Sequence, residues 1–333
     1  MKKFGLIGSG ISDSGSPALF KAAYGGRYSY DLLDGNNFKS LFERFKKGYD
    51  AVNVTSPFKD DAFKAADEAS EAAELCGTAN MLIKLPNGKI LADNSDFEGV
   101  TLSIMSAYAV ADVDVDDEDA FAGFLADKTA LVVGCSGAGK AAAAATVTLG
   151  YGRTILMNRT EEKAVALKQH LLSFYEDLSE EELQVRGISD FKEAFAEADA
   201  VIYTASAALD TDLSSIEANP EKLVLEANYK TPFLDKWKDK YTYIDGLNWL
   251  YNQAVVSYEA FTGEEPCEDE MKQQLNDTLV YKAPAFRLTS LLGDRNTLQT
   301  IRIFLQLSRE IFLRIPALIR HLWVMALVPL QVP

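Results

Sequence analysis

Short apolar runs alternate with helical stretches through the first hundred residues. Residues 4–8 and 51–55 (FGLIG and AVNVT) are apolar and lead into small or polar residues, which predicts two strands that end in loops. Residues 40–48 are amphipathic and residues 59–77 are rich in Ala and Glu, which predicts two helices that end at Gly48 and Gly77. This alternation predicts a largely parallel sheet with helical crossovers.

The pattern becomes more informative after an acidic segment at residues 111–127. Six of its first nine residues are Asp or Glu, which predicts a solvated loop or linker near a domain junction. Residues 129–160 then read as a buried strand, a turn of small residues, an Ala-rich helix that ends near 150–152, and a second strand. This order in about thirty residues is typical of a dinucleotide-binding βαβ unit. Residues 199–207 and 222–228 are further candidates for parallel strands.

The turn within this unit is an imperfect glycine loop. A pyrophosphate binds such a turn through backbone N–H groups at the start of the helix, and the pattern wants Gly-x-Gly-x-x-Gly/Ala. A serine takes the middle position, and a neighbouring glycine lets the turn adjust. The predicted phosphate-binding residues are Gly134, Ser136, Gly137, Ala138 and Gly139. The alternative is a helix start that only needs small residues, but the flanking strands favour a nucleotide site.

The end of the second strand bears on which nicotinamide cofactor is used. An NAD site would place an acid there to bind the ribose hydroxyls. This strand instead ends in Asn158, Arg159 and Thr160, and Lys163 lies one turn into the next helix. Two cations there suit a 2′-phosphate, so NADP is favoured and NAD stays open. The alternative for Arg159 is an ordinary solvated arginine.

Composition narrows the class of protein. The chain has 333 residues, a length that suggests two domains. Its 33 Lys+Arg and 49 Asp+Glu give a net charge of −16, which argues against binding to nucleic acid. Two histidines exclude a multi-His metal site, so no metal is expected. Three widely spaced cysteines and an N-terminal apolar run too short for a signal peptide favour a reducing, cytoplasmic location.

Polar residues recur where candidate strands of the first domain end, as α/β sites require. With no histidine in this region, a lysine is the plausible proton donor for reduction of a ketone, and a neighbouring aspartate would orient it and hold it protonated. Any one of these residues alone is more often structural than functional. The set comprises Ser14, Ser16, Asn53, Thr55, Lys59, Asn80 and Asp96.

Several of these segments, taken in order, resemble the shikimate dehydrogenase family. The resemblance rests on SDSGSP, NVTSPFK, CGTAN, DNSDFEG, NRTEEKA, EANYKTPFL and GLNWLYNQA, and runs from Phe4 to about Pro266. It implies that Ser14 and Ser16 hold a substrate carboxylate and that Lys59 is the catalytic lysine with Asp96 as its partner. The further substrate contacts that it implies are Asn53, Thr55, Asn80, Tyr229 and Gln253.

The resemblance implies NADP-dependent reduction of 3-dehydroshikimate to shikimate, a small-molecule substrate. The chain is expected to be a monomer or a homodimer. The sequence departs from the family pattern chiefly on the cofactor side: Ser136 replaces a glycine, Tyr203-Thr204-Ala205 replaces Asn-Ala-Thr, Trp249 replaces a methionine, and Asp13 replaces a histidine. Two alternatives stay open. One is a quinate or related cyclic polyol-acid dehydrogenase, and the other is a non-catalytic ligand-binding paralogue with a degraded cofactor loop.

The predicted architecture is a two-domain α/β protein. Residues 1–104, completed by 245–280, form an α/β substrate-binding and catalytic domain, and residues 105–244 form a Rossmann-type NADP-binding domain. Residues 281–333 are an atypical basic, apolar tail. From Met271 onward the chain has eight Lys+Arg and three Asp+Glu, whereas residues 1–270 carry a net charge of −21. No transmembrane segment is expected, and the tail is a candidate for binding a membrane surface or a partner, or is an appended end without such a role.

Overall fold

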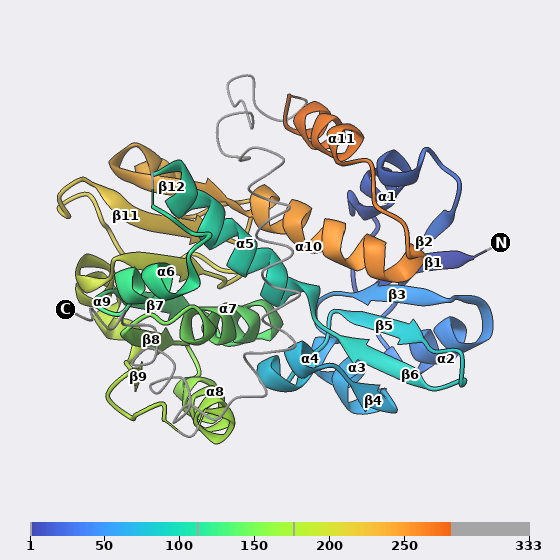
Figure 1. The fold of residues 1–333 in the computed structure, drawn as a ribbon, viewed down its shortest axis with the longest axis horizontal. Coiled ribbons are helices and arrows are strands. Elements are labelled where there is room, and N and C mark those ends of the chain that lie inside the picture. Colours follow the sequence, from blue (N-terminus) through green and yellow to red (C-terminus); the bar gives the residue numbers. More distant parts are fainter. Residues whose placement is uncertain (1, 112, 176, 281–333) are drawn as a thin grey trace, which may run out of the picture.

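The computed structural model describes residues 2–111, 113–175 and 177–280. They form two six-stranded sheets. The two longest helices, α5 (Ser95–Val110) and α10 (Gly246–Thr262), lie between these sheets (Figure 1). The predicted tail at 281–333 lies outside the described residues.

The first sheet has the strand order β2-β1-β3-β5-β6-β4. The β1–β2, β1–β3 and β4–β6 pairs are parallel, but β5 runs antiparallel to both of its neighbours, so this sheet is mixed. The expectation of a largely parallel sheet therefore needs correction at its centre, where β5 and β6 follow one another as a hairpin. The strands are β1 (Lys3–Gly8), β2 (Ser29–Asp34), β3 (Ala51–Val54), β4 (Glu68–Ala69), β5 (Met81–Lys84) and β6 (Ile90–Asp93).

The helix predicted over residues 59–77 is wrong as a single element. It is two helices, and residues 66–70 between them contain β4, which pairs with β6. Ser70 caps the second helix by accepting from the Ala73 N–H, and Gly77 ends that helix in the left-handed region with φ of 59°. Gly48 is the last residue of its helix, but the cap is the extended Tyr49. The helices beside this sheet are α1 (Ser16–Tyr24), α2 (Phe38–Gly48), α3 (Lys59–Ala65), α4 (Glu71–Cys76) and α11 (Glu268–Val280).

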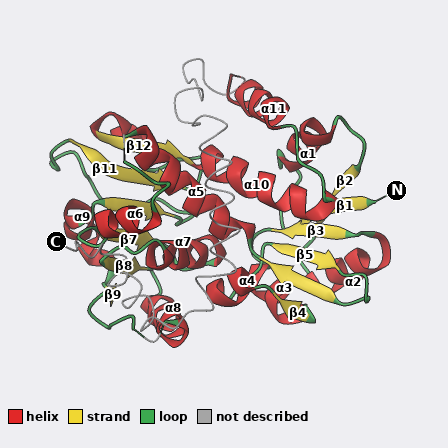
Figure 2. Ribbon diagram, viewed as in Figure 1, coloured by secondary structure: helices red, strands yellow, loops and turns green. Residues whose placement is uncertain are grey.

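The second sheet is fully parallel, in the order β12-β11-β10-β7-β8-β9. Counted from β7, this is the 3-2-1-4-5-6 order of dinucleotide-binding folds. Figure 2 shows helices on both sides of it. Its strands are β7 (Thr129–Val133), β8 (Arg153–Met157), β9 (Leu183–Val185), β10 (Ala200–Tyr203), β11 (Asn219–Glu226) and β12 (Tyr241–Asp245). Its helices are α6 (Glu118–Leu125), α7 (Gly137–Thr148), α8 (Glu161–Phe174), α9 (Phe191–Glu197), and two 3₁₀ turns, η1 (Ile188–Asp190) and η2 (Asp235–Lys240).

The acidic segment 111–127 is not a loop throughout, because α6 forms within it. The Asp117 side chain accepts from the Ala120 N–H at 3.0 Å, which caps the helix. Phe121 and Leu125 lie four residues apart on one face and are buried against the second sheet's core. Burial of these two apolar residues therefore stabilises a helix within this otherwise acidic segment.

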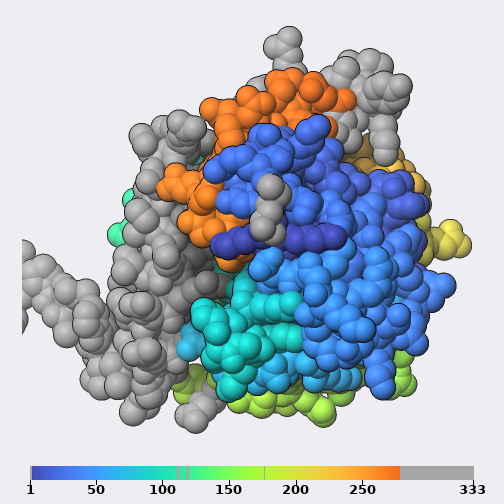
Figure 3. Space-filling model, turned by 90° about the vertical axis from the view of Figure 1, so that its right-hand side faces the viewer, coloured from blue at the N-terminus to red at the C-terminus, as the bar shows by residue number. Residues whose placement is uncertain are grey.

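Both sheets bury alternate residues on opposite faces. In β7, Ala130 and Val132 pack with α5 to α8, whereas Leu131 and Val133 pack with α9. In β1, Phe4 faces α1, α10 and α11, whereas Ile7 faces α2 and α3. In Figure 3 the orange C-terminal segment lies against the blue N-terminal residues. The chain therefore returns to the first sheet after β12.

Helix α5 packs against both α10 and α7, so it belongs to the junction between the sheets. The predicted boundary at 104/105 falls inside it. The predicted return of the chain at residue 245 coincides with the end of β12. Within the described ranges, no helix is long and apolar enough to cross a membrane.

Candidate active site

A cavity of about 300 Å³ lies between the two sheets. It is lined by residues from the ends of first-sheet strands, from the first turn of α7, from the segment after β11 and from α10. All nine predicted catalytic and substrate-contacting residues lie on it, although they are spread over most of the chain. They are Ser14, Ser16, Asn53, Thr55, Lys59, Asn80, Asp96, Tyr229 and Gln253.

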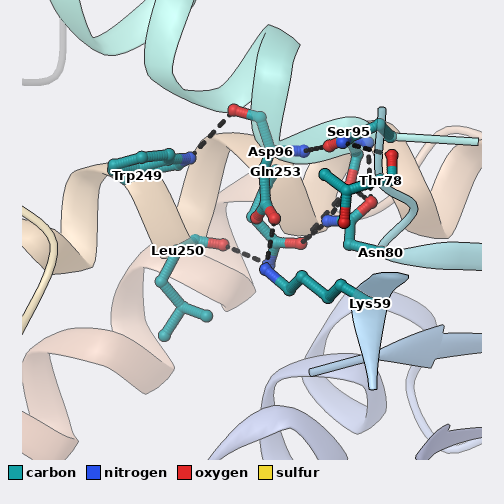
Figure 4. A network of polar contacts seen from close by, with 9 residues as sticks. Lys59, Thr78, Asn80, Ser95, Asp96, Trp249, Leu250 and Gln253 are labelled. Atoms are coloured by element: carbon teal, nitrogen blue, oxygen red, sulfur yellow. Dashed lines mark hydrogen bonds and ion pairs between the residues drawn. The ribbon is translucent and has the colours of Figure 1, made fainter. Parts of the chain in front are cut away.

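Lys59 and Asp96 form an ion pair in this cavity (Figure 4). Lys59 is the first residue of α3, and Asp96 lies in the first turn of α5, where its N–H donates to the capping side chain of Asn94 at 3.1 Å. The two side chains are only 16% and 11% exposed. Low exposure strengthens the attraction between them, so the carboxylate holds the ammonium where a bound carbonyl or alcohol would meet it.

Beside this pair, three polar side chains form a network that joins α5 to α10. Asn80 accepts from the Ser95 N–H at 2.8 Å, and its Nδ2 donates to Ser95 Oγ at 3.0 Å. Gln253 on α10 accepts from Asn80 Nδ2 at 3.5 Å and from Ser95 Oγ at 3.4 Å. Figure 4 shows these residues next to Lys59 and Asp96. The network fixes the start of α5 against α10, and with it the position of the Asp96 backbone.

Hydrogen-bond donors also lie on the cavity away from this network. Ser14 Oγ donates to Ser16 Oγ at 3.2 Å at the start of α1. Asn53 is 7% exposed, and its Oδ1 accepts from Tyr30 Oη at 2.8 Å. Its Nδ2 has no hydrogen-bond partner in the part of the chain that the structure describes. The site therefore offers hydroxyl and amide donors, which suit a small polyhydroxylated or anionic molecule.

The glycine loop between β7 and α7 has a geometry that needs three of its glycines. Gly134 has φ of 99°, and a Cβ on Gly139 would lie 1.8 Å from the Gly134 oxygen. A Cβ on Gly137 would lie 2.6 Å from Cδ of Lys59, so this loop directly adjoins the Lys59–Asp96 ion pair. Ser136 is exposed, and its side chain caps none of the N–H groups of α7. The first turn of α7 can therefore present backbone N–H groups to a phosphate.

The residues predicted to choose the cofactor lie next to this loop. Asn158 Oδ1 accepts from the Cys135 N–H at 3.1 Å, and Asn158 Nδ2 donates to the Thr160 oxygen at 2.7 Å. Arg159 and Lys163 are exposed, and neither forms an ion pair with a described residue. Burial raises the pKa of the Cys135 thiol to about 12, an effect that Lys140 and Lys163 oppose. The donor set and the two cations fit a dinucleotide that carries an extra phosphate.

Comparisons with known proteins show what the chain resembles in sequence and in fold. A family model for the shikimate dehydrogenase substrate-binding domain matches residues 6–82. The chain is 29% identical over 282 residues to a shikimate dehydrogenase (NADP(+)) of Colwellia psychrerythraea, a match that covers 79% of this chain and 92% of that protein. The crystal structure of shikimate dehydrogenase from Aquifex aeolicus matches with a TM-score of 0.67 and 27% identity, over 83% of this chain and 98% of that one. The chain is therefore similar, over most of its length, to shikimate dehydrogenases.

A further structural match is a shikimate dehydrogenase in complex with NADP⁺. Its TM-score is 0.65 at 26% identity, and the match covers 84% of this chain and 96% of that one. The similarity extends over both sheets, so this chain shares the two-sheet architecture of these shikimate dehydrogenases. Across the described ranges, no group of three or more His, Cys, Asp or Glu side chains is placed to hold a metal ion.

The positions where this chain departs from the shikimate dehydrogenase pattern have defined contacts. Thr204 Oγ1 donates to the backbone oxygens of Val133 and Gly134, at 2.9 and 3.2 Å, and so fixes the glycine loop. The Tyr203 hydroxyl donates to the Ala207 oxygen at 2.8 Å. Trp249 Nε1 donates to the backbone oxygen of Asp96 at 2.9 Å. Of these bonds, those of Thr204 support the glycine loop, and that of Trp249 reaches the backbone of Asp96.

Two residues of the site were missed by the sequence interpretation. Glu226 is buried at the end of β11 and accepts from the N–H groups of Phe233 and Leu234, at 2.5 and 2.8 Å, and from Tyr243 Oη at 3.0 Å. Burial raises the pKa of its carboxyl. These bonds close the loop that carries Tyr229 to the cavity. The signal was an acid at the end of an otherwise apolar strand.

The other missed residue is Lys230, which, unlike Glu226, lines the cavity. Its Nζ lies 2.8 Å from Oδ2 of Asp13, so an ion pair joins the segment after β11 to the loop after β1. Both side chains are substantially exposed, at 39% and 71%. The pair connects the two halves of the molecule at the edge of the cavity. No sequence spacing indicates it, because 217 positions separate the partners.

Proposed function

We propose that this chain catalyses the NADP-dependent interconversion of 3-dehydroshikimate and shikimate, with Lys59 as general acid in reduction and general base in oxidation. The observation that carries the proposal is the Lys59–Asp96 ion pair, placed on a cavity that the glycine loop adjoins at Gly137. A proton donor and a dinucleotide loop side by side are what reduction of a carbonyl requires.

The lining of the cavity supports a hydroxylated acid as the substrate. Ser14, Ser16 and Tyr229 would bind the carboxylate through their hydroxyl groups. Asn53, Thr55, Asn80 and Gln253 would bind the ring hydroxyls and the carbonyl through their polar side chains. The relatives named shikimate dehydrogenase support the same class of substrate.

The cofactor site would be formed by the first turn of α7 and the end of β8. The N–H groups at Gly137, Ala138 and Gly139 would hold the pyrophosphate, and Arg159 and Lys163 would hold a 2′-phosphate. The absence of an acid directly at the end of β8, and a relative solved with NADP⁺, support NADP over NAD.

When bound, the reduced cofactor supplies a hydride to the carbonyl carbon of the substrate. The Lys59 ammonium donates its proton to the carbonyl oxygen as negative charge develops there, which leaves a neutral amine and an alcohol. Asp96 would orient the ammonium toward the substrate before transfer. In the reverse direction the amine accepts the proton of the alcohol as the hydride leaves.

The test is absorbance at the nicotinamide band with shikimate and NADP, then with NAD, then with quinate. We expect turnover to be fastest with shikimate and NADP. Preference for quinate would replace the proposal with a cyclic polyol-acid dehydrogenase. No turnover with any pair, together with no heat of NADP binding in calorimetry, would favour a non-catalytic ligand-binding paralogue.

A further inference from the structure

Trp249 is placed where it can act on the catalytic pair without belonging to it. It lies in the first turn of α10, is 4% exposed and contributes to the lining of the cavity. Its indole N–H donates to the backbone oxygen of Asp96 at 2.9 Å (Figure 4). The methionine of the family pattern has no donor, so it could not form this bond.

The indole is held in place by close packing between α5 and α10. A Cβ on Gly99 would lie 2.9 Å from Cδ1 of Trp249 and 2.7 Å from Cβ of Gln253. Only glycine at this position lets the two helices approach so closely. A ring that is buried in this way loses few conformations when it forms its hydrogen bond.

The bonded oxygen belongs to the residue whose carboxylate binds Lys59. Asp96 lies in the first turn of α5, and three separate contacts fix that turn: the Asn94 cap, the Asn80–Ser95 bonds and the Trp249 bond. The Trp249 bond is the one that comes from α10 to Asp96 itself. Loss of the indole N–H would therefore allow the Asp96 backbone, and with it the carboxylate, to shift relative to Lys59.

We propose that Trp249 is a positioning residue: by binding the Asp96 backbone, it holds the Lys59–Asp96 pair in the geometry for proton transfer. This inference rests on the proposed function, because it concerns the rate of the same reaction. Trp249 acts through Asp96 and exchanges no proton with the substrate.

The kinetic test uses Trp249→Phe, which keeps an aromatic ring but removes the donor, and Trp249→Met. We expect kcat to fall about fivefold in both, the factor that one ordinary hydrogen bond is worth, with KM changed less than about twofold. Trp237→Phe is the matched control, because Trp237 packs against Phe233 in the second domain and does not line the cavity. Unchanged kcat in both Trp249 variants would overturn the proposal.

A double-mutant cycle separates positioning from a general structural role. If Trp249 acts through Asp96, Trp249→Phe should change kcat by less than about 1.5-fold in an Asp96→Asn background. Equal effects in both backgrounds would mean that Trp249 acts independently of the carboxylate, and would overturn the proposal.

A spectroscopic measurement does not depend on turnover. In protein labelled with ¹⁵N-tryptophan, the indole signal that disappears in Trp249→Phe should exchange slowly with solvent in the wild type. Rapid exchange would overturn the contact. Slow exchange in a protein that reduces none of the tested substrates would show that the proposed function has failed and the Trp249–Asp96 bond has not.

Discussion

At the scale of single residues, the Lys59–Asp96 ion pair, which we propose is catalytic, is less exposed than the Lys230–Asp13 ion pair at the edge of the same cavity. The side chains of Lys59 and Asp96 are 16% and 11% exposed, whereas those of Lys230 and Asp13 are 39% and 71% exposed. Water screens the second pair much more than the first. Among the residues that the structure describes, the one histidine, His170, does not take the role of Lys59, because it binds backbone oxygens of α4 and does not line the cavity.

Replacing Lys59 by alanine removes the proposed proton donor. We expect kcat to fall at least ~100-fold, with a much smaller effect on KM, because general acid catalysis is lost and the hydroxyl and amide donors of the cavity remain. Steady-state kinetics with shikimate and NADP measure both constants. Lys64→Ala, an exposed residue on the same helix, is the control. Near-normal turnover of Lys59→Ala would end the catalytic role.

Replacing Arg159 by alanine removes one of the two cations proposed for the 2′-phosphate. We expect KM for NADP to rise about tenfold, because a charge-assisted contact is lost, whereas KM for NAD should stay within about twofold. NAD is thus the internal control for the same variant. Equal changes for both cofactors would place Arg159 elsewhere in the site or outside it.

At the scale of elements, the regular alternation of strands and helices was predictable from the sequence. The break within residues 59–77 and the short helix α6 were not. The strands and helix around the glycine loop have long apolar runs, and they form where the sequence predicts them. The break in residues 59–77 depends on β4 pairing with β6, and α6 depends on the core that receives Phe121 and Leu125. Both are tertiary contacts, so local composition could not indicate them.

In the candidate site, too, some features were predictable from the sequence and others were not. Residues at the ends of strands come together because strand ends of one sheet share an edge, so Asn53, Lys59 and Asn80 were predictable as a group. The Trp249–Asp96 bond and the Lys230–Asp13 pair depend on how the two halves of the chain lie against each other. Sequence spacing carries no information of that kind.

Glu226 links the stability of one loop to pH. Burial raises the pKa of its carboxyl above 4.5, the value for an exposed glutamate, so the folded protein binds this proton more tightly than the unfolded chain. Its contribution to the free energy of unfolding is therefore greatest below about pH 4.5, and it decreases as pH rises through the higher, folded-state pKa. Glutamine is neutral at every pH and lacks this dependence.

We therefore expect the stability difference between wild type and Glu226→Gln to move in favour of the variant as pH rises from about 4.5 to 8. Urea unfolding at a series of pH values measures it. Glu217→Gln removes an exposed carboxylate from the same domain and is the control. A difference that stays constant or moves towards the wild type would contradict a raised pKa at Glu226.

At the scale of the whole molecule, two kinds of contact join the half of the chain around the first sheet to the half around the second sheet. One kind lies outside the cavity lining and the other lies on it. Away from it, Lys140 on α7 binds Asp60 at 2.8 Å and the Gly77 oxygen at 3.2 Å. His170 Nε2 on α8 lies 3.0 Å from the oxygens of Glu74 and Leu75, near the end of α4. At the cavity, the Lys230–Asp13 pair is an exposed link. The first set lies outside the cavity lining, whereas Lys230 and Asp13 are part of it.

Because the chain is acidic, we expect the Lys230–Asp13 ion pair to affect the affinity for an anionic substrate. A protein of net charge −16 must bind an acid through local positive charge, and Lys230 is a cation on the cavity lining. In Lys230→Ala the Asp13 carboxylate loses this partner beside Ser14, which we propose binds the substrate carboxylate. We expect KM for shikimate to rise about fivefold, with a change of less than about 1 kcal/mol in the free energy of unfolding, because exposed ion pairs contribute little to stability.

The comparison variant is His170→Ala, for which we expect a loss of stability with little change in KM. It removes a contact between the two halves that lies outside the cavity lining, so the melting temperature should fall while KM stays within about twofold.

A second substitution, Asp13→Asn, tests whether Lys230 acts by neutralising Asp13. It should restore most of the affinity lost in Lys230→Ala, because the repelling charge is then gone. High salt should reduce the KM difference between Lys230→Ala and wild type. If Asp13→Asn restores nothing, Lys230 acts by contact with the substrate and not by neutralising Asp13.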